Sequence, residues 1–170
     1  MRDGARAHHR SHRASRSRCV VIPEDCHDEH APSKPRRNSD RVLLAKWEHG
    51  ANHLVFIYPL WLGTLPALLK GFLEQVFRDG FAVRFAAAGR GWTRLLKGKS
   101  ARIVVTMGMP ALIYRVYFGA HGLKSLERSV LAFAGIGPIR ESLIGRVESR
   151  GTESRGRRLI KMQTLGRAAR

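Results

Sequence analysis

The sequence of 170 residues contains only two cysteines, Cys19 and Cys26, which are too few for a disulfide framework and fit a reducing cytoplasm. Residues 54–69 contain neither a charged side chain nor a histidine, but this run is shorter than the roughly 20 residues that a membrane-spanning helix needs, and it contains two prolines. The first twenty residues lack the apolar stretch of a secretory signal. These shortages exclude disulfide-rich and membrane-spanning classes and predict a cytoplasmic protein without a transmembrane segment.

Aromatic residues are absent from both ends of the chain, since all thirteen lie between Trp47 and Phe133. Aromatic side chains bury large apolar areas, so we expect the core in this region. Arg, His, Ser, Pro and Asp dominate residues 1–40, and such a segment buries too little apolar surface to offset the entropy of ordering it. The sequence therefore predicts a disordered basic, His-rich segment over residues 1–40 and one domain over residues 41–170.

The His-rich segment does not match a metal site. Cys26, His27 and His30 lie close together in the sequence, but their spacing fits no zinc pattern and no hydrophobic framework surrounds them. We therefore predict that the chain holds no metal ion.

Acidic residues are scarce: 13 Asp and Glu accompany 31 Lys and Arg, which gives a formal net charge of +18. Such an excess favours anionic partners such as nucleic acid, acidic membranes or phosphorylated ligands. However, no long Lys/Arg block occurs, and basic charge alone is a weak indicator of nucleic-acid binding. We therefore interpret the charge as a solvated basic surface and keep binding to nucleic acid or another acidic surface as an alternative.

The hydrophobic pattern alternates between strand-like and helix-like segments. Continuous apolar, β-rich runs predict buried parallel strands near residues 54–58, 102–106 and 139–144. Apolar residues at helical spacing predict helices at residues 41–49, 65–78, 112–134 with an interruption near 119–122, and 154–168. Residues 81–97 lack a period and suggest a surface excursion with a short hairpin. The order of these elements predicts an α/β fold, an open parallel sheet with right-handed crossovers and helices on both faces.

Ligands of an open parallel sheet bind at the carboxyl ends of its strands. Two loops follow predicted strands at that edge, residues 59–64 and 106–110. Neither a Gly-rich dinucleotide fingerprint nor a phosphate-loop motif follows a predicted strand. The pattern thus predicts where a ligand binds without naming the ligand.

Four segments of the sequence are more specific: residues 58–72 (YPLWLGTLPALLKGF), 106–110 (TMGMP), 120–122 (AHG) and 141–145 (ESLIG). Together, and in this order, they resemble the flavodoxin-like NAD(P)H dehydrogenase (quinone) family over residues 47–148. The resemblance implies a flavodoxin-like fold that uses FAD or FMN as a cofactor. It also implies transfer of hydride from NAD(P)H, through the flavin, to a small quinone-like acceptor, and family members are often homodimers.

The resemblance also implies where the flavin ring lies. The first loop would lie against the ring, and Pro59 would fix the direction of the chain there. Apolar and aromatic surface beside the ring would come from Leu60, Trp61 and Leu62. Gly63 would let backbone amides approach the polar edge of the ring closely. Backbone groups of the second loop would contact the other edge of the ring, from Thr106, Met107 and Gly108. Taken alone, each loop is also compatible with an ordinary turn between a strand and a helix.

A tyrosine and a histidine complete the predicted site. Tyr114 and His121 resemble a family pair that faces the flavin and stabilises charge as hydride arrives. Their spacing is one residue longer than in the mammalian quinone reductases, so Tyr117 is an alternative to Tyr114.

The sequence departs from the family at its beginning. Members begin with an apolar strand and a loop that wraps the flavin phosphates, whereas residues 19–22 look too short for that strand and no phosphate-binding character follows them. We therefore expect an N-terminally truncated or frameshifted member, without the first strand and the phosphate loop, that binds flavin poorly. The alternative functions are an inactive remnant of the fold and a basic protein that binds nucleic acid or acidic surfaces.

Overall fold

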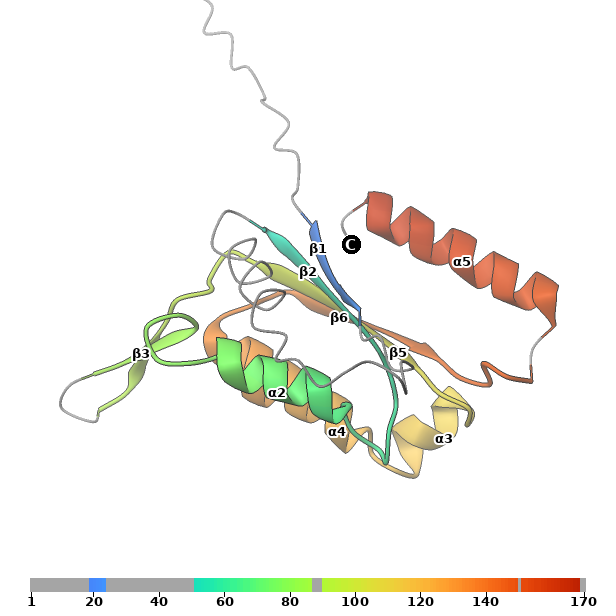
Figure 1. Ribbon diagram of the computed structural model, residues 1–170, viewed down its shortest axis with the longest axis horizontal. Helices are drawn as coiled ribbons and strands as arrows, with labels where there is room; N and C mark the ends of the chain where they lie inside the picture. The colour runs from blue at the N-terminus through green and yellow to red at the C-terminus, as the bar shows by residue number, and fades with distance from the viewer. Residues whose placement is uncertain (1–18, 24–50, 87–89, 150, 169–170) are drawn as a thin grey trace, which may run out of the picture.

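The computed structural model describes residues 19–23, 51–86, 90–149 and 151–168 (Figure 1). Their main feature is a four-stranded sheet in the order β1-β2-β5-β6, in which every neighbouring pair is parallel. The strands are β1 (Cys19–Pro23), β2 (His53–Pro59), β5 (Ser100–Thr106) and β6 (Ile139–Ile144). The three predicted strands and the parallel α/β class are thus confirmed.

Strand β1 corrects the expectation that the first strand is missing. It pairs with β2 from Cys19 opposite His53 to Pro23 opposite Ile57. An edge strand needs only one partner, and the β-branched residues of this segment favour an extended backbone, so five residues suffice. A proline is tolerated at such an edge because its missing N–H interrupts no second ladder. The rest of residues 1–40 lies outside the described residues, as do the predicted helix 41–49, the residues that follow β1 and the Cys26–His30 cluster.

The helices follow the predicted pattern with two differences. They are α2 (Ala67–Val76), α3 (Ala111–Val116), α4 (His121–Lys124), η1 (Ser125–Ala132) and α5 (Thr152–Arg167), and a hairpin of β3 (Val83–Phe85) and β4 (Trp92–Arg94) fills the predicted excursion. The predicted interruption is real, because Gly119 and Ala120 both adopt positive φ angles of 63° and 50°. The first difference is that η1 is wound as a π-helix.

The core lies between one face of the sheet and the helices α2, α4 and η1. Alternate residues of the two central strands point into it, with Leu54 and Phe56 from β2 and Ile103 and Val105 from β5 fully buried. Apolar residues of the helices complete the cluster, among them Leu69, Leu73, Val76, Leu123, Leu126 and Leu131. This face anchors the elements that lead into the loops of the carboxyl edge.

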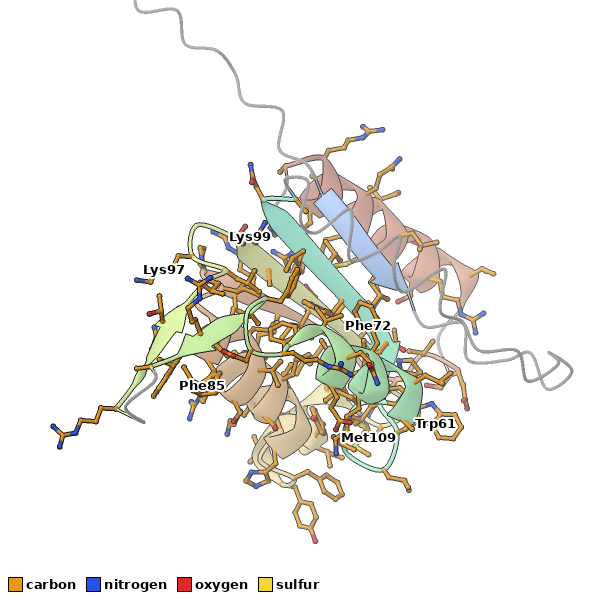
Figure 2. The ribbon with its side chains drawn as sticks, turned by 60° about the vertical axis from the view of Figure 1, so that its left-hand side comes forward. Trp61, Phe72, Phe85, Lys97, Lys99 and Met109 are labelled. Carbon is orange, nitrogen blue, oxygen red and sulfur yellow. The ribbon has the colours of Figure 1, made fainter. Side chains whose placement is uncertain are left out.

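Helix α5 is the second difference. It lies on the opposite side of the sheet from α2 and α4, as Figures 1 and 2 both show. The predicted helix is present, but none of its residues, all of which are described, is buried, and Leu159 and Ile160 are exposed. None of the described helices is long and apolar enough to span a bilayer.

Candidate functional site

Three loops meet at the carboxyl edge of the sheet. Leu60 N donates to Thr106 O over 2.8 Å, which joins the first loop (residues 59–64) to the second loop (residues 106–110) as predicted. A third loop, residues 145–147, follows β6 and bonds to the second, since Arg146 N donates to Met109 O over 3.2 Å. Figure 2 shows Trp61 and Met109 at this same end of the sheet.

The first loop is closed by a tight turn. Trp61 and Thr64 exchange backbone hydrogen bonds of 3.2 and 2.8 Å, and the residues between them, Leu62 and Gly63, have φ angles of 45° and 80°. Two consecutive left-handed residues define a type I′ turn, which glycine adopts freely and leucine does not. The turn exposes the Leu62 side chain fully and the Trp61 side chain by half, whereas Leu60 packs against the core.

The two loops differ in which backbone groups remain open. Met107 N donates to Ile144 O over 2.9 Å and Met107 O accepts from Val147 N over 3.3 Å, so both backbone groups of Met107 are occupied. Within the described part of the chain, the N–H groups of Leu62, Gly63 and Gly108 have no hydrogen-bond partner. Of the three residues predicted in the second loop, Gly108 is therefore the one that offers a free donor.

The two tyrosines near the loops have opposite environments. Tyr114 is 1% exposed, and burial raises the pKa of its hydroxyl, an effect that the Leu123 N–H partly offsets. Its hydroxyl donates to Gly63 O over 3.4 Å and accepts from Leu123 N over 3.3 Å. Tyr117 is 81% exposed and packs edge-to-face against Phe118. Solvent-borne ligands can thus reach Tyr117 and not Tyr114, in contrast to the predicted preference.

His121 begins helix α4 beside the first loop. Its exposed ring lies next to Gly119, where an added Cβ would be 2.7 Å from His121 Nε2. The next residue, Gly122, touches the loop directly, because an added Cβ would lie 2.4 Å from Gly63 O and 2.6 Å from Thr64 Cα. The structure therefore places Gly122, the residue after His121, against the first loop, while the exposed His121 ring lies beside Gly119.

Sequence reasoning missed two of the contacts that shape this edge. Gly122 and Gly145 each allow backbone to approach backbone, and an added Cβ at Gly145 would be 2.5 Å from Ala111 N. Both glycines belong to segments that resemble the family, at 120–122 and 141–145, which was the available signal. Backbone packing of this kind leaves no periodicity in the sequence, so only the identity of the glycine marks it.

A surface hollow of about 310 Å³ lies beside these loops, against strand β6. Ala111, Leu112 and Leu143 form its apolar wall, and the Arg115–Glu141 ion pair of 2.8 Å forms its polar side. The two charges satisfy each other, so the hollow offers no free charge to a ligand.

Within the described ranges, no three His, Cys, Asp or Glu side chains are placed to hold a metal ion.

Comparison with known proteins identifies the fold family. The model of a family described as flavodoxin-like fold matches residues 19–163. An uncharacterized NAD(P)H oxidoreductase of Haemophilus influenzae is 33% identical over 88 residues, which are 52% of this chain and 35% of the relative. NAD(P)H dehydrogenase [quinone] 1 of Cavia porcellus is 34% identical over 112 residues, which are 62% of this chain and 39% of the relative.

A solved structure agrees with these sequence matches. The protein Smu.1420 from Streptococcus mutans superposes with a TM-score of 0.66 at 28% identity, covering 77% of this chain and 67% of its own. The chain spans less than two fifths of the length of the curated relatives named above. With the parallel sheet and the loops at its carboxyl edge, the family-model match shows that the chain belongs to the flavodoxin-like fold family.

Proposed function

We propose that this chain supplies the ring-binding part of an NAD(P)H-dependent, flavin-linked oxidoreductase that passes hydride to a quinone-like acceptor. Similarity to the NAD(P)H oxidoreductase of Haemophilus influenzae and to NAD(P)H dehydrogenase [quinone] 1 of Cavia porcellus supports this reaction class. The observation that carries the proposal is the open N–H groups of Leu62, Gly63 and Gly108 at the edge where Trp61 is exposed.

These residues fit the ring of a flavin. Such a ring is flat, and it carries hydrogen-bond acceptors along one edge, which suit the three open N–H groups. An added Cβ at Gly63 or Gly108 would meet nothing within 4 Å, so the chain leaves room for the ring edge beside both backbones. Trp61 offers aromatic surface for its face. FAD and FMN share this ring, so both suit the described residues, and NADH and NADPH are both suitable donors.

The flavin supplies hydride acceptance when it is bound, which no amino-acid side chain provides. The protein then contributes position and protons. His121 is exposed and precedes Gly122, which touches the first loop, and an imidazole can act as a general acid or base in catalysis. We propose His121 as the catalytic group, with the accessible Tyr117 in the role that the sequence assigns first to Tyr114.

A pair of matched glycine variants tests this proposal. Gly108→Ala and Gly71→Ala each add one methyl group where nothing lies within 4 Å. At Gly108 the methyl fills the space proposed for the ring edge, so the Kd for FMN and FAD should rise by at least about tenfold. Gly71 lies in α2, so its variant should bind flavin like the parent chain. Quenching of flavin fluorescence during titration with protein gives these constants.

The same titration can reject the proposal. Equal affinities of the parent chain and both variants would show that the ring does not lie at the second loop. Failure of a folded parent chain to bind either flavin would favour the alternative of an inactive remnant. Oxidation of NADH or NADPH followed at 340 nm with a simple quinone then tests the reaction itself.

We also propose that the functional form is a homodimer. Three large apolar residues of α3 are exposed, Leu112, Ile113 and Val116, and exposed apolar patches mark association surfaces. Sedimentation should give the mass of a dimer for the parent chain and of a monomer for Val116→Glu. A parent chain that sediments as a monomer at micromolar concentration would refute the dimer.

A further inference from the structure

We infer that Tyr114 is a positioning residue whose buried hydroxyl clamps the first loop onto helix α4, and that it does not touch the ligand. The importance of this loop rests on the proposed function. The clamp itself is a property of the chain and can be tested without any flavin.

The clamp joins two elements that are distant in the sequence. The hydroxyl of Tyr114 donates to Gly63 O over 3.4 Å and accepts from Leu123 N over 3.3 Å, so one oxygen connects the tight turn to the first turns of α4. On the helix side of this junction, Gly122 lies so close to Gly63 O that no side chain would fit between them. Loop and helix therefore meet backbone to backbone, and Tyr114 lies behind that contact.

The effect on the loop is to fix one peptide unit at both ends. Tyr114 holds the carbonyl of Gly63, and the N–H of Thr64, which belongs to the same peptide, donates to Trp61 O over 2.8 Å. This peptide adjoins the one that carries the open N–H of Gly63, and the N–H of Leu62 belongs to the next peptide along the same turn. Fixing it therefore sets the direction in which those donors point.

The turn needs such support because of its sequence. Leu62 has a φ angle of 45°, a left-handed conformation that a leucine adopts only when its surroundings enforce it. Its side chain is fully exposed and makes no packing contribution. The contacts that hold the turn must come from its backbone, and Tyr114 supplies one of them.

Burial separates this role from a catalytic one. Tyr114 is 1% exposed, so no ligand can contact it without displacement of the loop or α4. Burial raises the pKa of its hydroxyl, so the group keeps its proton at neutral pH and can always donate to Gly63 O. Tyr117, in contrast, is exposed, so a ligand can contact it without displacing either element.

Hydrogen exchange of the flavin-free chain tests the clamp. Tyr114→Phe removes one oxygen and keeps the ring, so the fold should persist. Loss of one neutral hydrogen bond at each end of the clamp, to Gly63 O and from Leu123 N, should speed exchange of the Thr64 and Leu123 amides about fivefold. Tyr117→Phe is the matched control and should leave both amides unchanged. Amides in the centre of β5 should exchange equally in all three proteins, which shows that any change is local.

Flavin titration separates positioning from catalysis. In Tyr114→Phe the Kd for FMN should rise about fivefold, while turnover at saturating FMN stays near that of the parent chain. Unchanged exchange at Thr64 and Leu123 would overturn the clamp, even if the chain binds no flavin. Lost turnover with unchanged Kd would overturn it as well, because the hydroxyl would then act on the reacting atoms.

Discussion

The two faces of the sheet are stabilised by different kinds of contact. On one face, the side chains of Leu54, Phe56 and Ile103 pack against α2, α4 and η1 in an apolar core. On the other face, strand β5 presents the buried side chain of Arg102, whose guanidinium donates to Ser142 Oγ over 2.7 Å. The α5 helix lies on this second side and buries none of its residues. The comparison indicates that the apolar face carries the stability of the fold.

The proposed site depends on the apolar face. The first loop leaves β2 at its carboxyl end and is held by Tyr114 and Gly122, which belong to α3 and α4 on that side. We therefore expect substitutions in the apolar face to disturb both stability and the loops. Substitutions on the α5 side should change stability slightly and leave the loops intact.

The largest expected effect is a difference in unfolding free energy between alanine substitutions of two leucines, one on each side of the sheet. Leu126 in η1 is completely buried, so Leu126→Ala should lower the free energy of unfolding by about 2–5 kcal/mol. Leu159 in α5 is 70% exposed, so Leu159→Ala should change it by less than about 0.5 kcal/mol. Urea unfolding gives both values. Similar losses for the two variants would mean that α5 shares the core, and the contrast between the faces would be wrong.

A somewhat smaller effect should follow from crowding the loop junction. Gly122→Ala places a methyl group 2.4 Å from Gly63 O, and relief of such overpacking should cost about 1–3 kcal/mol of unfolding free energy. Gly108→Ala adds the same group into open space and should unfold like the parent chain. Thermal unfolding compares them. Equal stability of the two variants would show that α4 does not press on the first loop.

The face of the sheet that carries Arg102 and His53 should make the free energy of unfolding depend on pH. His53 is buried and its Nδ1 lies 2.7 Å from Ser100 Oγ, and burial lowers its pKa, with further lowering from Arg102 on β5 and Arg140 on β6. The unfolded chain thus takes up a proton before the folded chain does. This contribution to stability is complete above about pH 6.5 and declines as the pH falls below that value.

Replacement of the histidine isolates that contribution. His53→Gln cannot titrate, so its urea midpoint should fall less between pH 7.5 and pH 5.5 than that of the parent chain. The two proteins differ only at this side chain, so the difference between their falls isolates His53. An identical fall in both proteins would show that His53 titrates normally in the folded chain.

Local sequence predicts this fold where burial leaves a strong pattern. β5 is buried at five consecutive residues, and β2 is buried on its core face while Ile57 on its other face is exposed; both strands carry long apolar runs. The spacing of apolar residues in α2 reports its buried stripe. β1 was missed because its five residues lie in a charged segment. Its partner, β2, begins thirty positions after it, and only tertiary pairing makes it a strand.

The position of the site could be predicted from the sequence, but the direction in which its side chains point could not. Loops at the carboxyl ends of parallel strands had to meet, and they do. The inward direction of Tyr114 follows from the short α3 helix and from the left-handed residues Gly119 and Ala120, which turn the chain back onto it. The third loop bonds to Met107 and Met109 through backbone groups, and such bonds leave no side-chain signature.

The smallest expected effect tests the coupling of α5 to the rest of the molecule. Gly71 in α2 and Gly156 in α5 both have open space around them, and alanine favours a helix over glycine by roughly 0.8–1.0 kcal/mol. In α2 the neighbouring residues Leu69 and Leu73 are buried, so Gly71→Ala should raise the unfolding midpoint of the whole domain. In α5 the helix can form or melt without moving the core. Gly156→Ala should therefore increase the helical circular dichroism at low denaturant and leave the midpoint unchanged. If its midpoint rises as much as that of Gly71→Ala, α5 unfolds together with the core, and the second face contributes as cooperatively as the first.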